Sequence, residues 1–365
     1  MNWSVRYDQP VLFVFLLISF MMLAACTPQQ ATTQSSEKLE VHYIDVGQGD
    51  ATLLKGPDFT LLIDAGRHDA IDVTPYLQSQ GITDLDLMIL THPHADHVGQ
   101  ADKVIEAFPI KEVWMSGDEH TSATFERVLD ALLDSDAEYY EPRAGESFTI
   151  GSALVEVYNP ESVTGDLHEG SISVRISYGD IKFLFTGDAE YQTERDMINR
   201  GHNLKAHIFQ LGHHGSTTSN TQDFLDRVQP EVAIYSAREG NSYGHPHDEI
   251  IERIENMGID LYGTDEHGHI IVTTDGKQYT VSTDIGAITT EPKEEQETVR
   301  SIDDCLDINT ASKVELTEIT HIGEERAKEL IQFRPFLSLD ELSQIHGIGQ
   351  ARVTEIKEQG LACVR

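Results

Sequence analysis

Short apolar runs separated by glycine, aspartate and proline follow one another from Leu39 onward. Runs of this kind, rich in Val, Ile, Leu and Phe and bounded by turn residues, are typical of β-strands. The pattern predicts strands over residues 39–47, 51–56, 59–66, 85–92, 111–116, 153–160, 171–179, 181–188, 206–216 and 231–237.

The segments between these strands repeat their apolar residues at the spacing of an amphipathic helix. The helical pattern covers residues 97–108, 122–135, 189–201, 221–230 and 246–258. Two series of strands with helices between them predict an α/β fold of the αββα type, in which two sheets pack face to face and helices cover the outer faces. We expect this domain to occupy residues 39–288.

The chain changes character after this domain. Residues 289–302 are charged and show no hydrophobic period, which indicates a linker. Residues 303–365 contain an internal repeat, because "ELTEITHIGEERAKEL" at Glu315 returns 26 residues later as "ELSQIHGIGQARVTEI" at Glu341. Each copy predicts two helices joined by a tight turn at "HIG" or "GIG". The pattern therefore predicts a second, small all-α domain.

The N-terminal residues predict an export signal. The apolar run "VLFVFLLISFMMLAA" from Val11 to Ala25 is short for a membrane span and has the length of a signal-peptide core. Cys26 follows directly, and "LAAC" resembles the lipobox of bacterial lipoproteins, in which the cysteine is lipidated. We expect a lipoprotein signal over residues 1–25 and a polar tether over 26–38, with an ordinary secretory signal or an uncleaved anchor as alternatives. Each of these places the mature protein outside the cytoplasm.

Cysteine content and net charge add two constraints. The remaining cysteines, Cys305 and Cys363, flank the second domain, and an even pair in an exported chain indicates a disulfide; two free buried thiols are the alternative. The formal net charge of -36 favours solubility and argues against a simple surface for binding polyanions.

The string "THPHADH" at residues 91–97 holds four residues with metal-binding side chains. His92, His94 and Asp96 alternate at a strand end, so their side chains point the same way, and His97 begins the next helix. Imidazole and carboxylate together suit zinc, with manganese or iron as alternatives. The sequence therefore predicts a metal site at this sheet edge.

Two later strand ends supply further donors. "FLFTGD" ends in Asp188, and a carboxylate there is able to bridge two cations. "LGHHGS" supplies His213 and His214, and the spacing does not decide between them. The nearby Asp45, Asp50 and Asp64 are expected to orient histidines or shape turns rather than to bind metal.

Taken in order, "YIDVGQGDATLL", "LIDAG", "THPHADHVGQ", "FTGDAE", "LGHHGSTTSN" and "NSYGHPHDEII" resemble the metallo-β-lactamase fold superfamily from about Leu39 to Ile285. Within it, they look like the hydrolase domain of the competence protein ComEC and its secreted relatives. The resemblance implies two zinc ions. It assigns His92 and His94 to one ion and Asp96 and His97 to the other, with Asp188 as the bridge and His213, or His214 in its place, as the late ligand. Many members have one more histidine before the bridging aspartate, and His168 is the candidate here, with an exposed loop histidine as the alternative.

The resemblance also implies that the segment "NSYGHPH" lies at the mouth of the site. Asn241, Tyr243 and His245 are candidates for substrate contacts, with simple capping of the next helix as the alternative. We take Asp96, Asp188 and His245 as the catalytic residues, and His245 as a group able to protonate a leaving oxygen. Ser216 is a further candidate for contacting a phosphate, or for capping a helix.

The C-terminal repeat resembles the paired helix-hairpin-helix module of the ComEA family of DNA receptors over most of residues 307–360. Glycine in such turns lets backbone N–H groups face a phosphate, a contact that does not depend on base sequence. Residues 301–365 nevertheless carry 7 Lys and Arg against 12 Asp and Glu, so DNA binding is expected to be weak, with a protein-interaction or structural module as the alternative. The expected DNA contacts are Gly323, Arg326, Lys328, Gly347, Gly349 and Arg352.

Three functions are compatible with these features. The leading hypothesis is a cell-surface, metal-dependent phosphodiesterase that cuts DNA held by the second domain. A second keeps the metals but changes the substrate to a choline-phosphate ester of wall polymers, a lactone or a β-lactam, since a fold does not fix a function. A third is a non-catalytic surface receptor for DNA.

Overall fold

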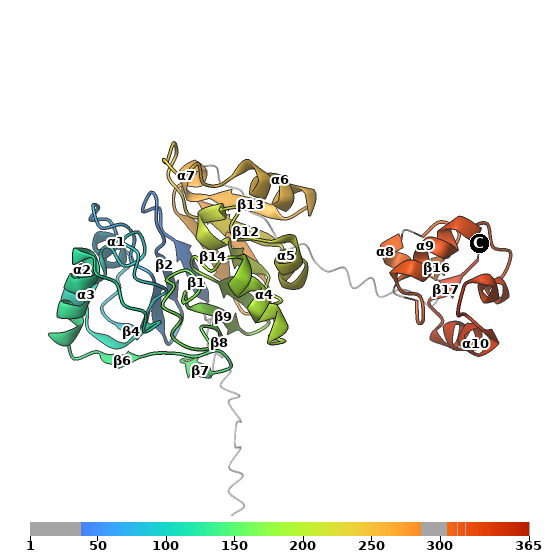
Figure 1. Ribbon diagram of the computed structural model, residues 1–365, viewed down its shortest axis with the longest axis horizontal. Helices are drawn as coiled ribbons and strands as arrows, with labels where there is room; N and C mark the ends of the chain where they lie inside the picture. The colour runs from blue at the N-terminus through green and yellow to red at the C-terminus, as the bar shows by residue number, and fades with distance from the viewer. Residues whose placement is uncertain (1–37, 286–304, 312, 318, 365) are drawn as a thin grey trace, which may run out of the picture.

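The computed structural model describes residues 38–285 and 305–364, except 312 and 318 (Figure 1). The expected signal over 1–25, Cys26, the tether apart from Lys38, and the linker over 289–302 lie outside the described residues. No helix of the described ranges combines the length and the apolar character needed to cross a membrane.

One mixed sheet of eight strands forms the first layer. Its strands pair antiparallel from β15 to β3 and parallel from β3 to β6. In spatial order they are β15 (Tyr279–Thr283), β14 (Ile270–Thr274), β1 (Leu39–Tyr43), β2 (Thr52–Lys55), β3 (Thr60–Ile63), β4 (Leu85–Leu90), β5 (Ile110–Met115) and β6 (Glu138–Tyr140).

A second sheet of seven strands packs against the first. Its strands pair parallel from β13 to β10 and antiparallel from β10 to β7. In spatial order they are β13 (Asp260–Gly263), β12 (Val232–Tyr235), β11 (Ile208–Gln210), β10 (Ile181–Phe185), β9 (Ser173–Tyr178), β8 (Ala153–Asn159) and β7 (Ser147–Ile150).

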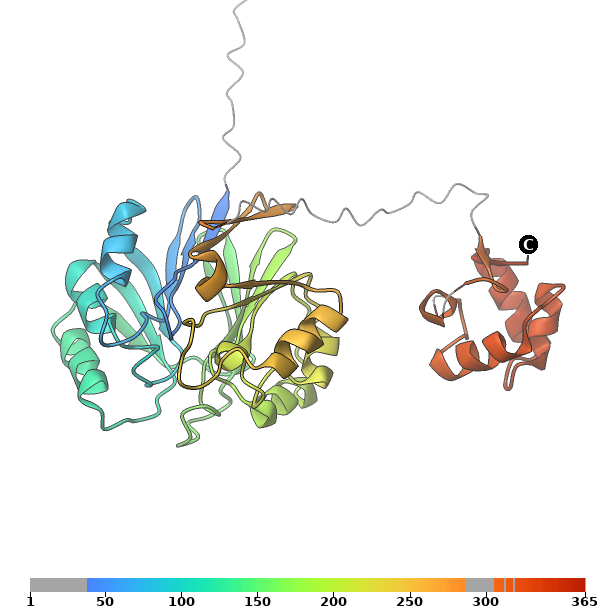
Figure 2. The same ribbon diagram turned by 90° about the horizontal axis from the view of Figure 1, so that it is seen from above.

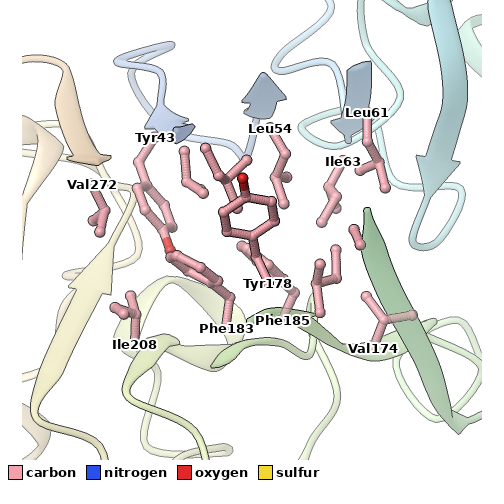
Figure 3. Packing of buried hydrophobic residues seen from close by; sticks show 14 of the residues in the cluster. Tyr43, Leu54, Leu61, Ile63, Val174, Tyr178, Phe183, Phe185, Ile208 and Val272 are labelled. Carbon is pink, nitrogen blue, oxygen red and sulfur yellow. The ribbon is translucent and has the colours of Figure 1, made fainter. Parts of the chain in front are cut away.

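The alternation of side chains along each strand decides which layer they join. In β3, Leu61 and Ile63 point into the core between the two sheets, whereas Leu62 points to the helix-covered face. Figure 3 shows Leu61 and Ile63 across from Phe183 and Phe185 of the other sheet. A strand buried on both faces explains why its sequence is continuously apolar.

Helices cover both outer faces, as Figure 2 shows. The first sheet is covered by α1 (Val73–Ser79), α2 (Ala101–Ala107) and α3 (Ala123–Leu133). The second is covered by α4 (Tyr191–Asn199), α5 (Gln222–Val228) and α6 (Asp248–Asn256). The short α7 (Thr264–His267) and the 3-10 turn η1 (Gly212–Gly215) complete the domain. The predicted αββα sandwich is confirmed, although β6, β7, α1 and β13 to β15 were not predicted.

The C-terminal unit has a hydrophobic core of its own, built from residues of both sequence repeats. Its helices follow the predicted repeat, and a parallel two-stranded pair joins its ends. The elements are β16 (Leu306–Asp307), α8 (Lys313–Leu316), α9 (Glu324–Phe333), η2 (Leu339–Gln344), α10 (Gln350–Gln359) and β17 (Ala362–Cys363). Beside the two strands, a disulfide links Cys305 and Cys363 across 58 residues.

Reduction of this disulfide should destabilise the C-terminal unit selectively. A crosslink closing a loop of this size stabilises a fold by about 4 kcal/mol on the chain-entropy model. Hydrogen exchange of α9 and α10 should therefore accelerate in dithiothreitol, or in the double variant Cys305→Ser/Cys363→Ser. The fully buried Trp114 gives an internal control, because its fluorescence reports unfolding of the first domain, whose midpoint should not move. Unchanged protection of α9 and α10 would contradict a stabilising role for the crosslink.

Candidate functional site

The predicted donors converge where the ends of both sheets meet. His92, His94 and His97 follow β4 of the eight-stranded sheet, whereas Asp188 and His214 follow β10 and β11 of the other. The loop at η1 adopts an unusual conformation, since His213 and His214 both have positive φ, at 51° and 55°.

A buried polar network fixes that loop. The Asn220 side chain accepts a hydrogen bond from the Gly212 amide and donates to the carbonyls of Gly212 and Ser216. The buried carboxylate of Glu194 on α4 in turn accepts hydrogen bonds from the backbone amides of Asn220 and Thr221. Positive φ is costly for residues other than glycine, and this network holds the two histidines in place.

Asp188 lies between two groups of histidines. Its Oδ1 is 3.2 Å from His97 Nε2 and 3.8 Å from His214 Nε2. Its Oδ2 is 3.5 Å from His92 Nε2 and 3.6 Å from His213 Nε2. A carboxylate with one oxygen directed at each group is arranged as a bridge between two cations.

The first group contains His92, His94, His168 and Asp188, whose donor atoms all lie within 4.8 Å of one another. The structure thus brings the loop residue His168 to the site, with its ring centroid 4.9 Å from that of His94. Asp118 holds this loop by accepting hydrogen bonds from the amides of Thr164 and Gly165. His213 lies beside His168, with ring centroids 4.9 Å apart.

The second group contains Asp50, His97, Asp188 and His214, whose donor atoms all lie within 4.8 Å of one another, and Asp96 lies beside His214. His214 Nε2 is 3.5 Å from Asp96 Oδ2, so His214 rather than His213 belongs to this group. The Nε2 atoms of His97 and His214 and Oδ1 of Asp188 are buried and make no hydrogen bond within the described residues. Buried polar atoms without partners are rare, and a bound cation would satisfy all three. The residues present therefore fit a metal ion.

Two aspartates orient these histidines from behind. Asp64 Oδ2 lies 2.8 Å from His97 Nδ1, and His214 Nδ1 lies 2.9 Å from the Ser236 carbonyl. Asp50 is close enough to the group to be a ligand itself, but it faces the Nδ1 atoms of His214 and His97, at 3.5 Å and 3.9 Å. Because the Nε2 atoms are the ones that face Asp188, we assign Asp50 and Asp64 to orientation. Asp45 accepts a hydrogen bond from the Gly47 amide and shapes its turn.

The charge balance of the site favours a cation. Burial lowers the pKa of His92 well below its usual range, so this ring is neutral and free to bind metal. Burial acts in the same direction on His97, but Asp188 and Asp64 outweigh it and hold the pKa of His97 well above its usual range. Burial likewise disfavours charge on Asp188, yet His97 and His214 hold its pKa well below its usual range. The carboxylates thus stabilise positive charge at this point, and a divalent ion would supply it in place of protons.

Asp64→Asn should lower metal affinity by about 10- to 100-fold, the range typical for groups that orient a ligand. An amide nitrogen placed against His97 Nδ1 favours the tautomer whose proton sits on Nε2, and that nitrogen then cannot bind metal. Competition with a zinc chelator would measure the affinity, with the exposed Asp130→Asn on α3 as the control. Equal affinity of all three proteins would rule out orientation by Asp64.

A cavity of about 420 Å³ opens over this centre. His94, Asp96 and Asp188 line it together with Tyr243 and His245, two of the residues expected to contact substrate. Asn241 lines the adjoining cavity of about 310 Å³, and its side-chain oxygen accepts hydrogen bonds from the backbone amides of Tyr243 and His245. Ser216 is buried, and its hydroxyl lies 3.1 Å from that of Thr218, so the structure does not bring it to the cavity wall.

His245 is placed to hydrogen-bond a substrate rather than to act as an acid. Burial and the neighbouring rings of His214, His213 and His247 lower the pKa of His245 to about 4. The ring is therefore neutral at neutral pH, and its Nδ1 is buried without a partner among the described residues. A neutral imidazole donates a hydrogen bond but is a poor proton donor to a leaving group.

Sequence reasoning assigned no role to four residues at the mouth of the site. Gln48 and His120 line the cavity over the metal centre. Arg67 and Arg238 line a second cavity of about 310 Å³, which shares Gln48 and Asp96 with the first. Gln48 and Arg67 come directly after predicted strands, and this position could have indicated a role at the sheet edge.

The turns of the C-terminal unit match each other in backbone conformation. Gly347 has a φ of 76°, and His321 at the matching position of the first turn has a φ of 66°. Gly323 and Gly349 stand at the N-termini of α9 and α10, where backbone N–H groups point outward. The unit therefore presents two helix N-termini of the kind that contact phosphates.

Several cations of this unit are partly engaged within it. Arg326 donates to the carbonyls of His321 and His346 and so joins the two turns, while Arg352 donates to the carbonyl of Gly347. Lys357 pairs with Asp340. Lys328, also predicted to contact DNA, lies on α9. The cationic surface left for a polyanion is thus smaller than the sequence count suggests.

Comparison with known proteins gives a family match for each of the two units. Residues 44–237 match the metallo-beta-lactamase superfamily, and residues 303–359 match the helix-hairpin-helix motif. ComE operon protein 3 from Bacillus subtilis is 29% identical over 255 residues, covering 64% of this chain and 33% of that protein. Competence protein ComA from Neisseria gonorrhoeae is 29% identical over 231 residues, covering 61% and 30%.

A protein named deoxyribonuclease from Thioalkalivibrio is 47% identical over 60 residues, covering 16% of this chain and 17% of that protein. The chain spans a third or less of the length of these three relatives. Both family resemblances expected from the sequence are thereby confirmed.

Proposed function

The chain belongs to the metallo-beta-lactamase superfamily, and from that premise we propose that it is a metal-dependent phosphodiesterase that cuts DNA outside the cell. The observation that carries the proposal is the position of Asp188, with one oxygen directed at each of two histidine groups. A pair of bound cations is the usual device for displacement at phosphorus.

The side chains would divide this work. His92, His94 and His168 would hold one ion, and Asp96, His97 and His214 the other, with Asp188 between them. Two zinc ions, with manganese as the alternative, would polarise the phosphoryl group and acidify the attacking water. His245 and Tyr243 line the same cavity and would hydrogen-bond the substrate.

The choice of DNA is supported by the C-terminal unit and by the relatives. The helix-hairpin-helix motif indicates DNA binding, and two of the relatives are named as a competence protein and a deoxyribonuclease. The module would hold the polymer by its phosphates and raise its concentration near the metal centre. Without base contacts, this retention would be independent of sequence and sensitive to salt.

The same proposal places the protein at the outer face of the membrane through a lipid on Cys26. Its support is the "LAAC" string after a short apolar run. Metabolic labelling with an alkyne fatty acid should mark the parent protein and leave Cys26→Ser unmarked. Equal labelling of the two proteins would rule out a lipid anchor on Cys26.

A substrate panel tests the activity against its alternatives. Metal-loaded protein should cleave DNA faster than a choline phosphodiester, a lactone or nitrocefin. If the protein cleaves one of these alternative substrates but no DNA, it is a hydrolase of another class and the nuclease proposal is wrong. A folded protein that retains no metal after supplementation, yet binds DNA, would favour the non-catalytic receptor.

A further inference from the structure

The second cavity adjoins the metal centre and brings together four loops. Gln48 comes from the loop after β1, Arg67 from the loop after β3, Asp96 from the loop after β4, and Arg238 and Tyr243 from the loop after β12. Because Gln48, Asp96 and Tyr243 line both cavities, a substrate seated over the metal ligands extends directly into this second space.

The two arginines meet over a glycine. A Cβ at Gly47 would lie 3.5 Å from Arg67 Nη1 and 3.8 Å from Arg238 Cδ, so both side chains pack on this bare backbone. Gly47 has a φ of 71°, a conformation that a larger residue rarely adopts. The glycine thus leaves room for the guanidinium group of Arg67 and the aliphatic part of Arg238 at one point of the site.

Among the described residues that line the two cavities, Arg67 and Arg238 are the only ones of the Lys or Arg type. Asp69 fixes Arg67 by pairing with its Nε and Nη2, which leaves Nη1 outside that pair. Arg238 is exposed, and within the described residues no hydrogen bond or ion pair is found for its guanidinium. A cation without a partner at the mouth of an acidic site is suited to an anionic group of the substrate.

We propose that the cavity lined by Arg67 and Arg238 binds a second phosphate of a polynucleotide, next to the one held at the metal centre. This inference rests on the proposed phosphodiesterase function and specifies its substrate as a chain rather than a single ester. Guanidinium groups suit phosphate because their N–H donors match its oxygens in charge and geometry. The subsite also accounts for how a chain with a net charge of -36 receives a polyanion, since the cationic contact is local.

Thymidine dinucleotides separate the subsite from the metal centre. TpT carries one phosphodiester, whereas pTpT and TpTp add a terminal phosphate on one side or the other. One of these should show a kcat/KM about 10-fold above that of TpT, as a charge-assisted contact provides. Arg238→Gln should reduce the advantage to less than about 2-fold while leaving TpT unchanged, and Arg227→Gln, an equal charge change on α5 that lines neither cavity, should keep it.

Three results would overturn the subsite. In the first, Arg238→Gln lowers kcat/KM equally on TpT and on the preferred phosphorylated dinucleotide. In the second, Arg238→Gln keeps the full preference for the phosphorylated dinucleotide. In the third, the parent protein has the same kcat/KM on all three dinucleotides. If nitrocefin turnover alone depends on Arg238, the anion bound there is a carboxylate and the phosphate assignment is wrong.

A failure of the proposed phosphodiesterase function can be told apart from a failure of the subsite. If no dinucleotide is cleaved, the phosphodiesterase proposal falls, and calorimetry on the same metal-loaded full chain still tests the subsite. The parent should then bind pTpT or TpTp about 10-fold more tightly than TpT, and Arg238→Gln should bind them alike. Equal affinities in the parent would overturn the subsite on this measurement as well.

Discussion

Asp188→Asn should abolish hydrolysis and release metal from the protein. Both oxygens of Asp188 face imidazole nitrogens, so the substitution removes negative charge from both candidate ion sites at once. We expect activity to fall by more than about 100-fold, beyond the range seen when only an orienting partner is lost. Metal content by mass spectrometry should fall in parallel, which ties the loss to the centre rather than to substrate contacts.

The control for this variant is Asp223→Asn, an exposed carboxylate on α5 that lines neither cavity. It should keep both metal and activity. Circular dichroism is the folding control for Asp188→Asn, because Asp188 is the counter-charge of His97 and His214 in the metal-free centre and the substitution removes it. A folded Asp188→Asn protein that keeps two ions and full activity would contradict the bridging assignment.

Removal of residues 305–365 should separate DNA retention from chemistry. The first domain has its own buried clusters between and outside its two sheets, and the C-terminal unit has another. We therefore expect the shortened protein to fold and to hydrolyse bis(p-nitrophenyl) phosphate at the parental rate. Affinity for long DNA should fall by about 10-fold or more, because the linked module no longer raises the local concentration of the polymer.

Salt gives the companion measurement. Binding through phosphates releases counterions, so the affinity of the parent should fall steeply as salt rises, and that slope should shrink after the truncation. His94→Ala in the full chain is the matched control, since it should lose hydrolysis while its DNA affinity stays. Unchanged DNA affinity in the shortened protein would refute the tethering role of the helix-hairpin-helix unit.

The sequence located the metal-binding string because it directly follows a strongly apolar strand. His92, His94 and Asp96 follow β4, whose apolar residues fill both layers, but residues 92–97 form bends and turns, so the expected alternation of their side chains does not set their directions. Asp188 follows a second strand in the same way. These predictions needed only the local period and the two-sheet architecture.

The choice between His213 and His214 could not be made from spacing. The two residues occupy a 3-10 turn with positive φ, where the alternation of a strand no longer applies. The Ser236 carbonyl and the buried loop network turn His214 toward Asp96. Long-range contacts of this kind leave no periodic trace in the sequence.

His168 was uncertain for a related reason. It lies in an irregular loop, and its approach to His94 depends on Asp118, which is 50 residues earlier in the chain and binds the loop backbone. Arg67 and Arg238 were missed because they meet only after four loops assemble. The three strands β13 to β15 were missed because their short runs carried no motif, although β14 pairs with β1 beside the site.

The positions of the charged residues also change what the acidity of the chain implies for DNA binding. Counting charges suggested repulsion between this protein and DNA. The structure instead gathers histidines and carboxylates where cations would bind, and two arginines beside them. Local positive charge, rather than net charge, would then decide where a phosphate binds.

Zinc titration of the chelated full chain, with manganese in a parallel series, tests whether the protein is a metal-dependent phosphodiesterase. The readout is cleavage of labelled single- and double-stranded DNA. We expect no cleavage without metal, a rate that rises and saturates as two ions bind, and no cleavage by His94→Ala under any condition. A protein that takes up both ions and still leaves every form of DNA intact would contradict this expectation.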